Sequence, residues 1–547
     1  MKSFLKTSVS LAAVATVAAG LFGAAPAAAQ DAASIQAIQQ QIQNLQSQLK
    51  RVQSDSARRD AELKRAQDDA AQARVQAEQA QKAAAAMPVV APAPVQPLLP
   101  HGAFRVGGVT VTLGGFVAAE GLYRSRNQAA GIDTSFNGGI PLPNSPNYHI
   151  PETRLTAQQS RFSLLAEGQA DDADKLTSYM ETDFLSAGSS SNSNQSNSYT
   201  LRMRQFWAGW DNSDYGLHVM GGQGWSLATM NRAGMLPRQE NVPLTIDAQY
   251  VVGFDWERQA EFRVVKDFYD HRLWAGISVE EPQTIFGSAA GNNCLTGATA
   301  GTGGGGTLEY AQCGGPNVNS IQSYSNNYAP DIIAKFAADP GWGHYEAYGL
   351  MRFLGGRVSY AATGTGTNYD TVGAGVGGGM ILPLVPKKLE FQVSGLFGRG
   401  VGRYGSAQLP DVTFSPTGKI EALQGYSVMG GFVGHPTPSL DIYAYGGAEG
   451  VQQKSFATGG YGNPTNNLAG CMNELGSCSA NTSGITEGTI GAWWRFFKGD
   501  YGTMQVGGQY EYIKRNTFAG TNGKGGTLSP SGDENVFLVS FRYLPFQ

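Results

Sequence analysis

The chain ends in VFLVSFRYLPFQ, from Val536 to Gln547, in a sequence otherwise rich in Gly, Ser and Asn. Every second residue is apolar or aromatic on one side, and the other side carries Arg542. A soluble core seldom buries an unpaired arginine, whereas the water-filled lumen of a barrel accepts one. The stretch therefore predicts a closing strand whose apolar face looks outward into lipid, through Phe537, Val539, Phe541 and Tyr543.

Composition favours a strand-based membrane protein that is exported from the cytoplasm. The 547 residues are 41% hydrophobic and include 73 Gly, and no stretch after residue 30 approaches the roughly 20 apolar residues of a membrane helix. Residues 1–29 read as a signal peptide, with Lys2 and Lys6, an apolar stretch and a small-residue cleavage site. Removing these lysines takes the net charge from -4 to -6, so charge points to no nucleic-acid partner.

Residues 30–86 predict a periplasmic coiled coil. Apolar residues step by three and four from Ile35 to Ala80, with breaks at Ser56 and Arg59. So narrow a stripe requires partner helices, and Ile at both early seam positions favours a trimer. A single helix or a disordered tether is the alternative. Five prolines then make residues 87–101 a stiff linker.

Residues 102–547 predict an all-β domain: a 16-stranded antiparallel transmembrane β-barrel. Seven short connections lie at Ala170, Asn212, Phe268, Asp339, Pro383, His435 and Lys498. Eight long ones lie near 125–153, 187–199, 228–248, 282–329, 355–369, 400–418, 455–484 and 516–533. This two-sided asymmetry is typical of an up-and-down membrane barrel with short turns in the periplasm.

The four cysteines suggest loop disulfides, and the histidines do not suggest an enzyme. The cysteines form two close pairs, Cys294 with Cys313 and Cys471 with Cys478, and local pairing is favoured among the three possible connectivities. Neither pair has partners at zinc spacing, so we expect no metal and no cofactor. The six histidines mostly lie at turns, termini or in loops, and nothing has catalytic spacing.

A family resemblance rests on several motifs in order along the chain. They are TAQQSRF at Thr156, YMETDF at Tyr179, LRMRQFWAGW at Leu201, GGQGWS at Gly221, ERQAEFRV at Glu257, PDIIAKF at Pro330, GWGHYEAYGLMRF at Gly341 and GRGVGRY at Gly398. Together they resemble the DcaP-type trimeric porins of Gram-negative outer membranes. The resemblance implies a homotrimeric, sixteen-stranded channel for small anionic solutes, with dicarboxylates as the best-known class. Phe546 resembles the C-terminal aromatic insertion signal, although Gln547 follows it.

Arginines are the candidate substrate-path residues, because rings of basic side chains select anions at a constriction. Arg202 and Arg204 share one strand face, about 7 Å apart by strand geometry. Arg258 and Arg263 have odd spacing, so one of them is expected at a rim. The third long loop carries two more arginines and is a candidate constriction. The full set is Arg161, Arg202, Arg204, Arg258, Arg263, Arg352, Arg232 and Arg238, with Lys335 and Arg542 as further candidates.

Each arginine also has a structural interpretation, which is pairing with a carboxylate of a neighbouring strand. The available partners are Glu120, Glu167, Glu181, Asp183 and Glu261. Two other functions remain open: a phosphate-selective or general porin, and a tether that joins the outer membrane to peptidoglycan or a periplasmic partner through the coiled coil.

Overall fold

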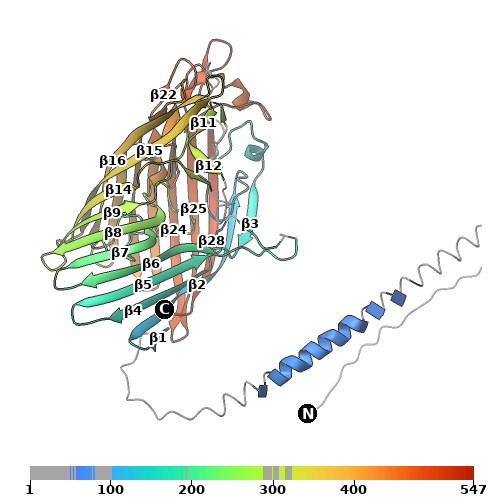
Figure 1. Ribbon diagram of the computed structural model, residues 1–547, viewed down its shortest axis with the longest axis vertical. Coiled ribbons are helices and arrows are strands. Elements are labelled where there is room, and N and C mark those ends of the chain that lie inside the picture. Colours follow the sequence, from blue (N-terminus) through green and yellow to red (C-terminus); the bar gives the residue numbers. More distant parts are fainter. Residues whose placement is uncertain are drawn as a thin grey trace, which may run out of the picture. The chain divides into compact units, whose positions relative to one another are not determined.

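The alternating sequence after residue 102 folds into a closed antiparallel β-barrel (Figure 1). This computed structural model describes residues 50, 53–54, 57–58, 60–76, 78–79, 102–186, 188–191, 194–287, 298–299, 307–313 and 323–547. They divide into two units, Met1–Pro97 and Leu98–Gln547. The predicted signal peptide and linker lie outside the described residues.

The first unit contributes a helix to the described residues. Residues 60–76 are continuously helical and exposed, including Leu63 and Val75. Within the described ranges, no helix has both the length and the apolarity needed to span a membrane. The coiled coil and its partner helices stay a prediction.

Sixteen of the described strands form the barrel, and each pairs with its neighbours in chain order. β2 closes the barrel, because Val109–Phe116 pairs with β4 and Val117–Arg124 pairs with β28. The predicted sixteen-stranded antiparallel fold is thereby confirmed. The strands are β2 (Val109–Arg124), β4 (Arg161–Gln169), β5 (Asp174–Asp183), β6 (Arg202–Asn212), β7 (Leu217–Trp225), β8 (Arg258–Phe268), β9 (Leu273–Glu280), β14 (Asp331–Ala338), β15 (His344–Tyr360), β16 (Thr365–Val385), β17 (Leu389–Arg399), β20 (Gln424–Thr437), β21 (Leu440–Val451), β24 (Thr482–Gly499), β25 (Gly502–Thr517) and β28 (Ser531–Leu544).

Shorter elements decorate the barrel, mostly in its long loops. β1 (Ala103–Val106) pairs with the start of β2, and β3 (Glu152–Thr156) pairs with its end. The others are β10 (Ala298–Thr299), β11 (Thr307–Glu309), β12 (Ala311–Cys313), β13 (Ser323–Ser325), β18 (Val412–Phe414), β19 (Ile420–Ala422), β22 (Lys454–Ser455), β23 (Gly460–Tyr461), β26 (Gly520–Thr521), β27 (Thr527–Leu528), and the 3-10 helices η1 (Pro146–His149), η3 (Gly402–Tyr404) and η4 (Ala469–Met472).

All seven predicted short turns connect consecutive barrel strands, but one predicted long loop is wrong. The segment 355–369 is not a loop, since β15 and β16 stay paired as far as Tyr360 opposite Thr365. The Gly- and Thr-rich sequence resembles a loop, yet its residues continue a two-stranded ladder that ends in a four-residue turn. Figure 1 shows β15 and β16 as two of the longest arrows of the barrel.

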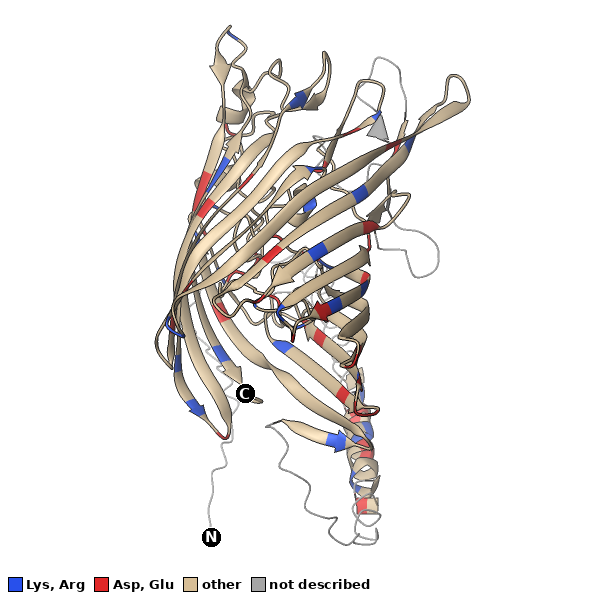
Figure 2. Ribbon diagram, turned by 90° about the vertical axis from the view of Figure 1, so that its left-hand side faces the viewer, with Lys and Arg blue, Asp and Glu red and all other residues tan. Residues whose placement is uncertain are grey.

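The last strand has the two faces that its sequence predicts. Phe537, Val539 and Phe541 are exposed on the outer face, whereas Leu538 and Ser540 are buried inside. Outward-facing apolar residues recur on other strands, and Figure 2 shows strands that are free of charge over most of their length. This surface suits lipid on the outer face.

One predicted disulfide lies within the described residues. Cys471 and Cys478 are bonded, with Cα atoms 4.5 Å apart, in the loop before β24. Cys294 lies outside the described residues, so its pairing with Cys313 stays a prediction.

Candidate functional site

The third long loop, residues 226–257, folds into the lumen and packs on one side of the wall. Its apolar residues Ile246, Val251, Val252 and Phe254 are fully buried. They belong to one core with inward-facing residues of β20, β21, β24, β25 and β28, and with three residues of the first long loop, Ile132, Phe136 and Ile140. Part of the interior is therefore a packed apolar core, and the loop narrows what remains of the lumen.

Wall carboxylates hold this loop by accepting its backbone N–H groups. Leu227 donates to Glu280 Oε1 (2.9 Å), and Asn231 donates to Glu346 Oε2 (3.1 Å). Val252 donates to Glu487 Oε2 (2.8 Å). The loop has no regular secondary structure to pair these buried N–H groups, and a buried N–H group without an acceptor costs folding free energy, so the carboxylates stabilise the loop.

Glu449 ties two loops together through a single oxygen. Its Oε1 accepts from the backbone N–H of Gly253 (2.8 Å) and from that of Ala407 (2.9 Å). Ala407 belongs to the loop between β17 and β20, so one wall residue fixes this loop and the loop 226–257.

A cavity of about 190 Å³ remains between the loop 226–257 and the wall. Three arginines from three strands line it: Arg161 of β4, Arg204 of β6 and Arg542 of β28. The other charged or ionisable lining groups are Glu181, Asp247 and Tyr250. We call this region the constriction.

Three arginines share two carboxylates beside the constriction. Arg204 Nε contacts Glu181 Oε1 (2.6 Å), and Arg161 Nη1 approaches Glu181 Oε2 (3.5 Å). Asp183 Oδ2 receives both Arg202 (2.8 Å) and Arg204 (3.0 Å). The Arg161 and Arg202 side chains are 26% and 34% exposed, so both reach water, and Arg202 binds both oxygens of Asp183 through Nε (2.9 Å) and Nη2 (2.8 Å).

A β-bulge places Arg204 between these acids. Glu181 lies opposite Gln205 and Thr182 lies opposite Met203, which leaves Arg204 as the extra residue of β6. A bulge redirects a side chain in this way. Arg202 and Arg204 thus reach the same carboxylate, in agreement with their predicted common face.

Arg258 and Arg542 lie against aromatic rings. Arg258 is the first residue of β8 and sits over Trp225 (5.2 Å) and Trp256 (5.1 Å). Among the described residues it has no ion pair, and its Nη1 has no hydrogen-bond partner. Arg542 lies between Phe116 (4.7 Å) and Trp493 (4.6 Å) and binds Glu120 (2.8 Å).

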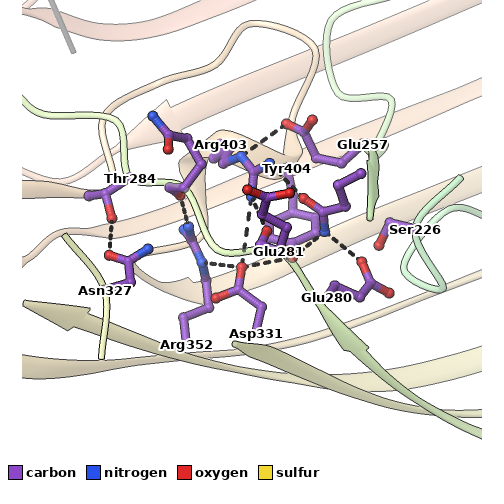
Figure 3. A network of polar contacts seen from close by, with 12 residues as sticks. Ser226, Glu257, Glu280, Glu281, Thr284, Asn327, Asp331, Arg352, Arg403 and Tyr404 are labelled. Carbon is purple, nitrogen blue, oxygen red and sulfur yellow. Dashed lines mark hydrogen bonds and ion pairs between the residues drawn. The ribbon is translucent and has the colours of Figure 1, made fainter. Parts of the chain in front are cut away.

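Arg352 is buried in a second network of polar contacts, none of whose labelled residues lines the constriction (Figure 3). It contacts Asp331 Oδ2 (3.0 Å) and Asp411 Oδ1 (2.7 Å), and its side chain is fully buried. Tyr404 donates a hydrogen bond to the same Asp331 oxygen (3.0 Å), and Arg403 reaches Glu257 (3.5 Å). This network joins the wall to the loop 226–257 and to the loop between β17 and β20, and the fully buried Arg352 side chain exposes no atoms to the lumen.

The remaining sequence candidates divide between the wall and the loop. Arg263 pairs with Glu261 (2.9 Å) and is buried. Lys335 pairs with Glu346 (2.8 Å) and contacts the backbone of the loop 226–257. Arg232 binds Glu390 (3.0 Å). Arg238, with φ +69°, lies over the ring of Tyr179 (4.9 Å) and lines a second cavity of about 310 Å³. Four of the five expected acidic partners bind arginines, namely Glu120, Glu181, Asp183 and Glu261, whereas Glu167 binds Lys175.

Two loop residues of the constriction, Asp247 and Tyr250, were not predicted from the sequence. Tyr250 has φ +71°, unusual for an aromatic residue, and its hydroxyl lies 3.4 Å from Arg204 Nη2. Burial opposes ionisation of Tyr250, but Arg204 and Arg258 lower its pKa below the ordinary value. Burial raises the pKa of Asp247 to about 6. The only sequence signal was the apolar run around these residues, which is unusual for a solvated loop.

The fold, unlike the sequence, matches known proteins. No family model matches the chain, and no curated protein matches its sequence. The outer-membrane channel DcaP of Acinetobacter baumannii matches over 81% of this chain and 100% of its own, with 17% identity and a TM-score of 0.53. The anion-selective porin from Comamonas acidovorans covers 80% and 99%, with 11% identity and a TM-score of 0.42, which is too low to support an argument. The expected resemblance is confirmed for the fold: this chain has the fold of the DcaP outer-membrane channel.

Proposed function

We propose that the protein is an outer-membrane porin through which small anionic solutes, above all dicarboxylates, diffuse. The short turns then face the periplasm and the long loops face the outside. The observation that carries the proposal is the excess of arginine at the constriction. In and beside the constriction, five arginines face four carboxyl groups: the arginines are Arg161, Arg202, Arg204, Arg258 and Arg542, and the acids are Glu120, Glu181, Asp183 and Asp247.

This excess favours anions because the surroundings strengthen each charge. The opposite side of the lumen is the apolar core, which has a low dielectric constant and screens charge poorly. The partly exposed side chains of Arg161 and Arg202 bind the two acids that the buried Arg204 bridges. A guanidinium group has five N–H donors, so donors that the ion pairs leave unused can contact the two carboxylates of one solute.

A planar-bilayer measurement tests the proposal. The purified protein is reconstituted under a salt gradient, the reversal potential is measured, and succinate or adipate is then added. We expect anion selectivity and interruption of the current by the dicarboxylate. Cation selectivity, or a conductance that dicarboxylates leave unchanged, would refute an anion pathway and would mean that the arginines serve only the wall.

A homotrimer and a periplasmic location of the coiled coil are part of the same proposal. Their support is the apolar seam in the sequence and the DcaP-like fold of the barrel. Three equal conductance steps for each insertion event would support three channels per particle.

A further inference from the structure

Four buried carboxyl groups surround the point where the loop 226–257 meets the last strands of the wall. Glu487 on β24, Glu511 on β25 and Glu534 on β28 face inward, and Asp247 comes from the loop. All four are at most 5% exposed, and Asp247 interacts electrostatically with each glutamate. We call these four residues the acid cluster.

The strand registers place the three glutamates side by side. Glu487 and Glu534 both lie opposite Ile513, one on each side of β25. Glu511 is two residues before Ile513 on the same inner face, so it is the diagonal neighbour of both. Diagonal neighbours of an antiparallel pair are about 7–8 Å apart, within reach of long side chains.

Each carboxyl group of the cluster uses one oxygen and leaves the other without a partner. Asp247 Oδ1 accepts from the N–H of Thr134 (3.1 Å) and of Gln249 (2.7 Å), and Glu487 accepts from Val252 (2.8 Å). Glu511 and Glu534 accept from glutamine side-chain amides. Among the described residues, no donor reaches the second oxygens, which are Asp247 Oδ2, Glu487 Oε1, Glu511 Oε2 and Glu534 Oε1.

Nearby cations do not balance four negative charges. Arg124 is the neighbouring cation, and it already binds Glu152 (3.0 Å) and the carbonyl of Gly131 (2.9 Å). The other ionisable groups that face the cluster are Glu449, Tyr443 and, across the constriction, Arg161, Arg204, Arg542, Glu181 and Tyr250. Like charges at this spacing in a buried site disfavour full ionisation.

We propose that the acid cluster is a proton-binding site that fastens the loop 226–257 to the wall. A protonated carboxyl donates its O–H to an oxygen that otherwise lacks a partner, and loss of the protons charges the cluster and releases the loop. The site goes beyond the proposed solute pathway, since it regulates the width of the lumen for any solute.

A proton is the ligand that this geometry favours over a divalent cation. Within the described ranges, no group of three or more Asp, Glu, His or Cys side chains is placed to hold a metal ion. Neutral carboxyl groups, in contrast, need no fixed coordination geometry and can pair with each other.

The direction of the pH effect follows from Asp247. Burial raises its pKa from the ordinary 3.8 to about 6, so the docked loop binds more protons than the released loop. Docking is strongest below about pH 4 and weakens as the pH rises toward 6. A shift of about two pKa units corresponds to on the order of a hundredfold in the docking equilibrium.

Single-channel recordings between pH 4 and pH 8 test the proposal. We expect wild type to show a small, quiet conductance at pH 4 and a larger, noisier one above pH 6. Asp247→Asn keeps the Oδ1 acceptor and stays neutral, so it should remain quiet up to pH 8. Asp133→Asn is the matched control, because Asp133 is an exposed acid of the loop that packs on this site, and it should titrate as wild type does.

A second readout does not depend on ion preference. Two variants are compared: Ala248→Cys, at the half-buried position next to Asp247, and Thr363→Cys, at an exposed position. The measured quantity is the rate at which a methanethiosulfonate reagent labels the first cysteine, divided by the rate at which it labels the second. We expect the ratio to rise on the order of a hundredfold between pH 4 and pH 7. A pH-independent conductance and labelling ratio, an Asp247→Asn variant that still titrates, or a response to calcium and EGTA instead of pH would each overturn the proposal. A channel without anion selectivity would leave both readouts intact.

Discussion

Replacing Arg161 by Gln should weaken anion selectivity without unfolding the barrel. Glu181 keeps its contact with Arg204 Nε (2.6 Å) and the hydroxyl of Tyr179 (3.0 Å), so the substitution leaves no unpaired buried charge. Two unit charges 4 Å apart attract by about 1 kcal/mol in water and about 4 kcal/mol near a protein surface. Since the Arg161 side chain is 26% exposed, we place the loss near the lower value. About 1–2 kcal/mol corresponds to a roughly five- to thirtyfold weaker interaction with a carboxylate.

The assay for Arg161→Gln is the half-blocking concentration of succinate on the single-channel current, measured together with the reversal potential. The half-blocking concentration should rise roughly five- to thirtyfold, and the reversal potential should move toward zero. Arg399→Gln is the matched control: Arg399 is exposed on the outer face of β17, and its loss should change neither quantity. Unchanged block in Arg161→Gln, or an equal change in both variants, would refute the assignment of Arg161 to the solute pathway.

Three further outcomes are expected. Lys335→Met removes the lysine partner of the buried Glu346, which keeps His344 Nε2 (3.0 Å), and should lower stability by about 3 kcal/mol, the lower end of the cost of breaking a buried ion pair, read from the denaturant midpoint of the folded-to-unfolded shift on gels; an unchanged midpoint would contradict this. Glu449→Ala leaves two buried backbone N–H groups without an acceptor, about 1–3 kcal/mol each, and should increase conductance noise, unlike a substitution at the exposed Glu474. Deletion of residues 31–100 should preserve conductance if the barrel is the functional unit, and it should abolish attachment of the outer membrane to the periplasm if the coiled coil is a tether; a deletion variant that no longer conducts would contradict the first expectation.

The wall of the barrel was predictable because lipid imposes a simple rule on it. Outward positions must be apolar and strands must alternate, so the sequence predicted that Phe537, Val539 and Phe541 point outward. It also predicted where the seven short turns connect consecutive strands. The exception, the β15–β16 hairpin, extends through a Gly- and Thr-rich sequence. Ladder hydrogen bonds come from the backbone, so a paired strand can continue where side chains resemble those of a loop.

The interior was less predictable because its contacts are not local in sequence. The constriction loop was anticipated near 228–248, but it extends over 226–257, and its anchors Glu280, Glu346, Glu449 and Glu487 lie far along the chain. No periodicity links an acid on one strand to a backbone N–H on a loop. The same limit applies to the arginines: their inward orientation followed from alternation, but whether one meets water or a carboxylate depends on the folded loop.

The roles of the interior carboxylates bear on the excess of arginine beside the constriction. Those on β9, β15, β21 and β24 accept from loop backbone, and the one that also has an ion pair with a basic residue among those described, Glu346, binds a lysine, Lys335. Those on β5, Glu181 and Asp183, do bind arginines, but two of them serve three. An irregular loop inside a barrel needs many acceptors for its N–H groups. Fixing the constriction loop thus occupies acids of four strands around the barrel, while the arginines beside the constriction outnumber the acids that bind them, so the same interactions that narrow the pore also favour anions.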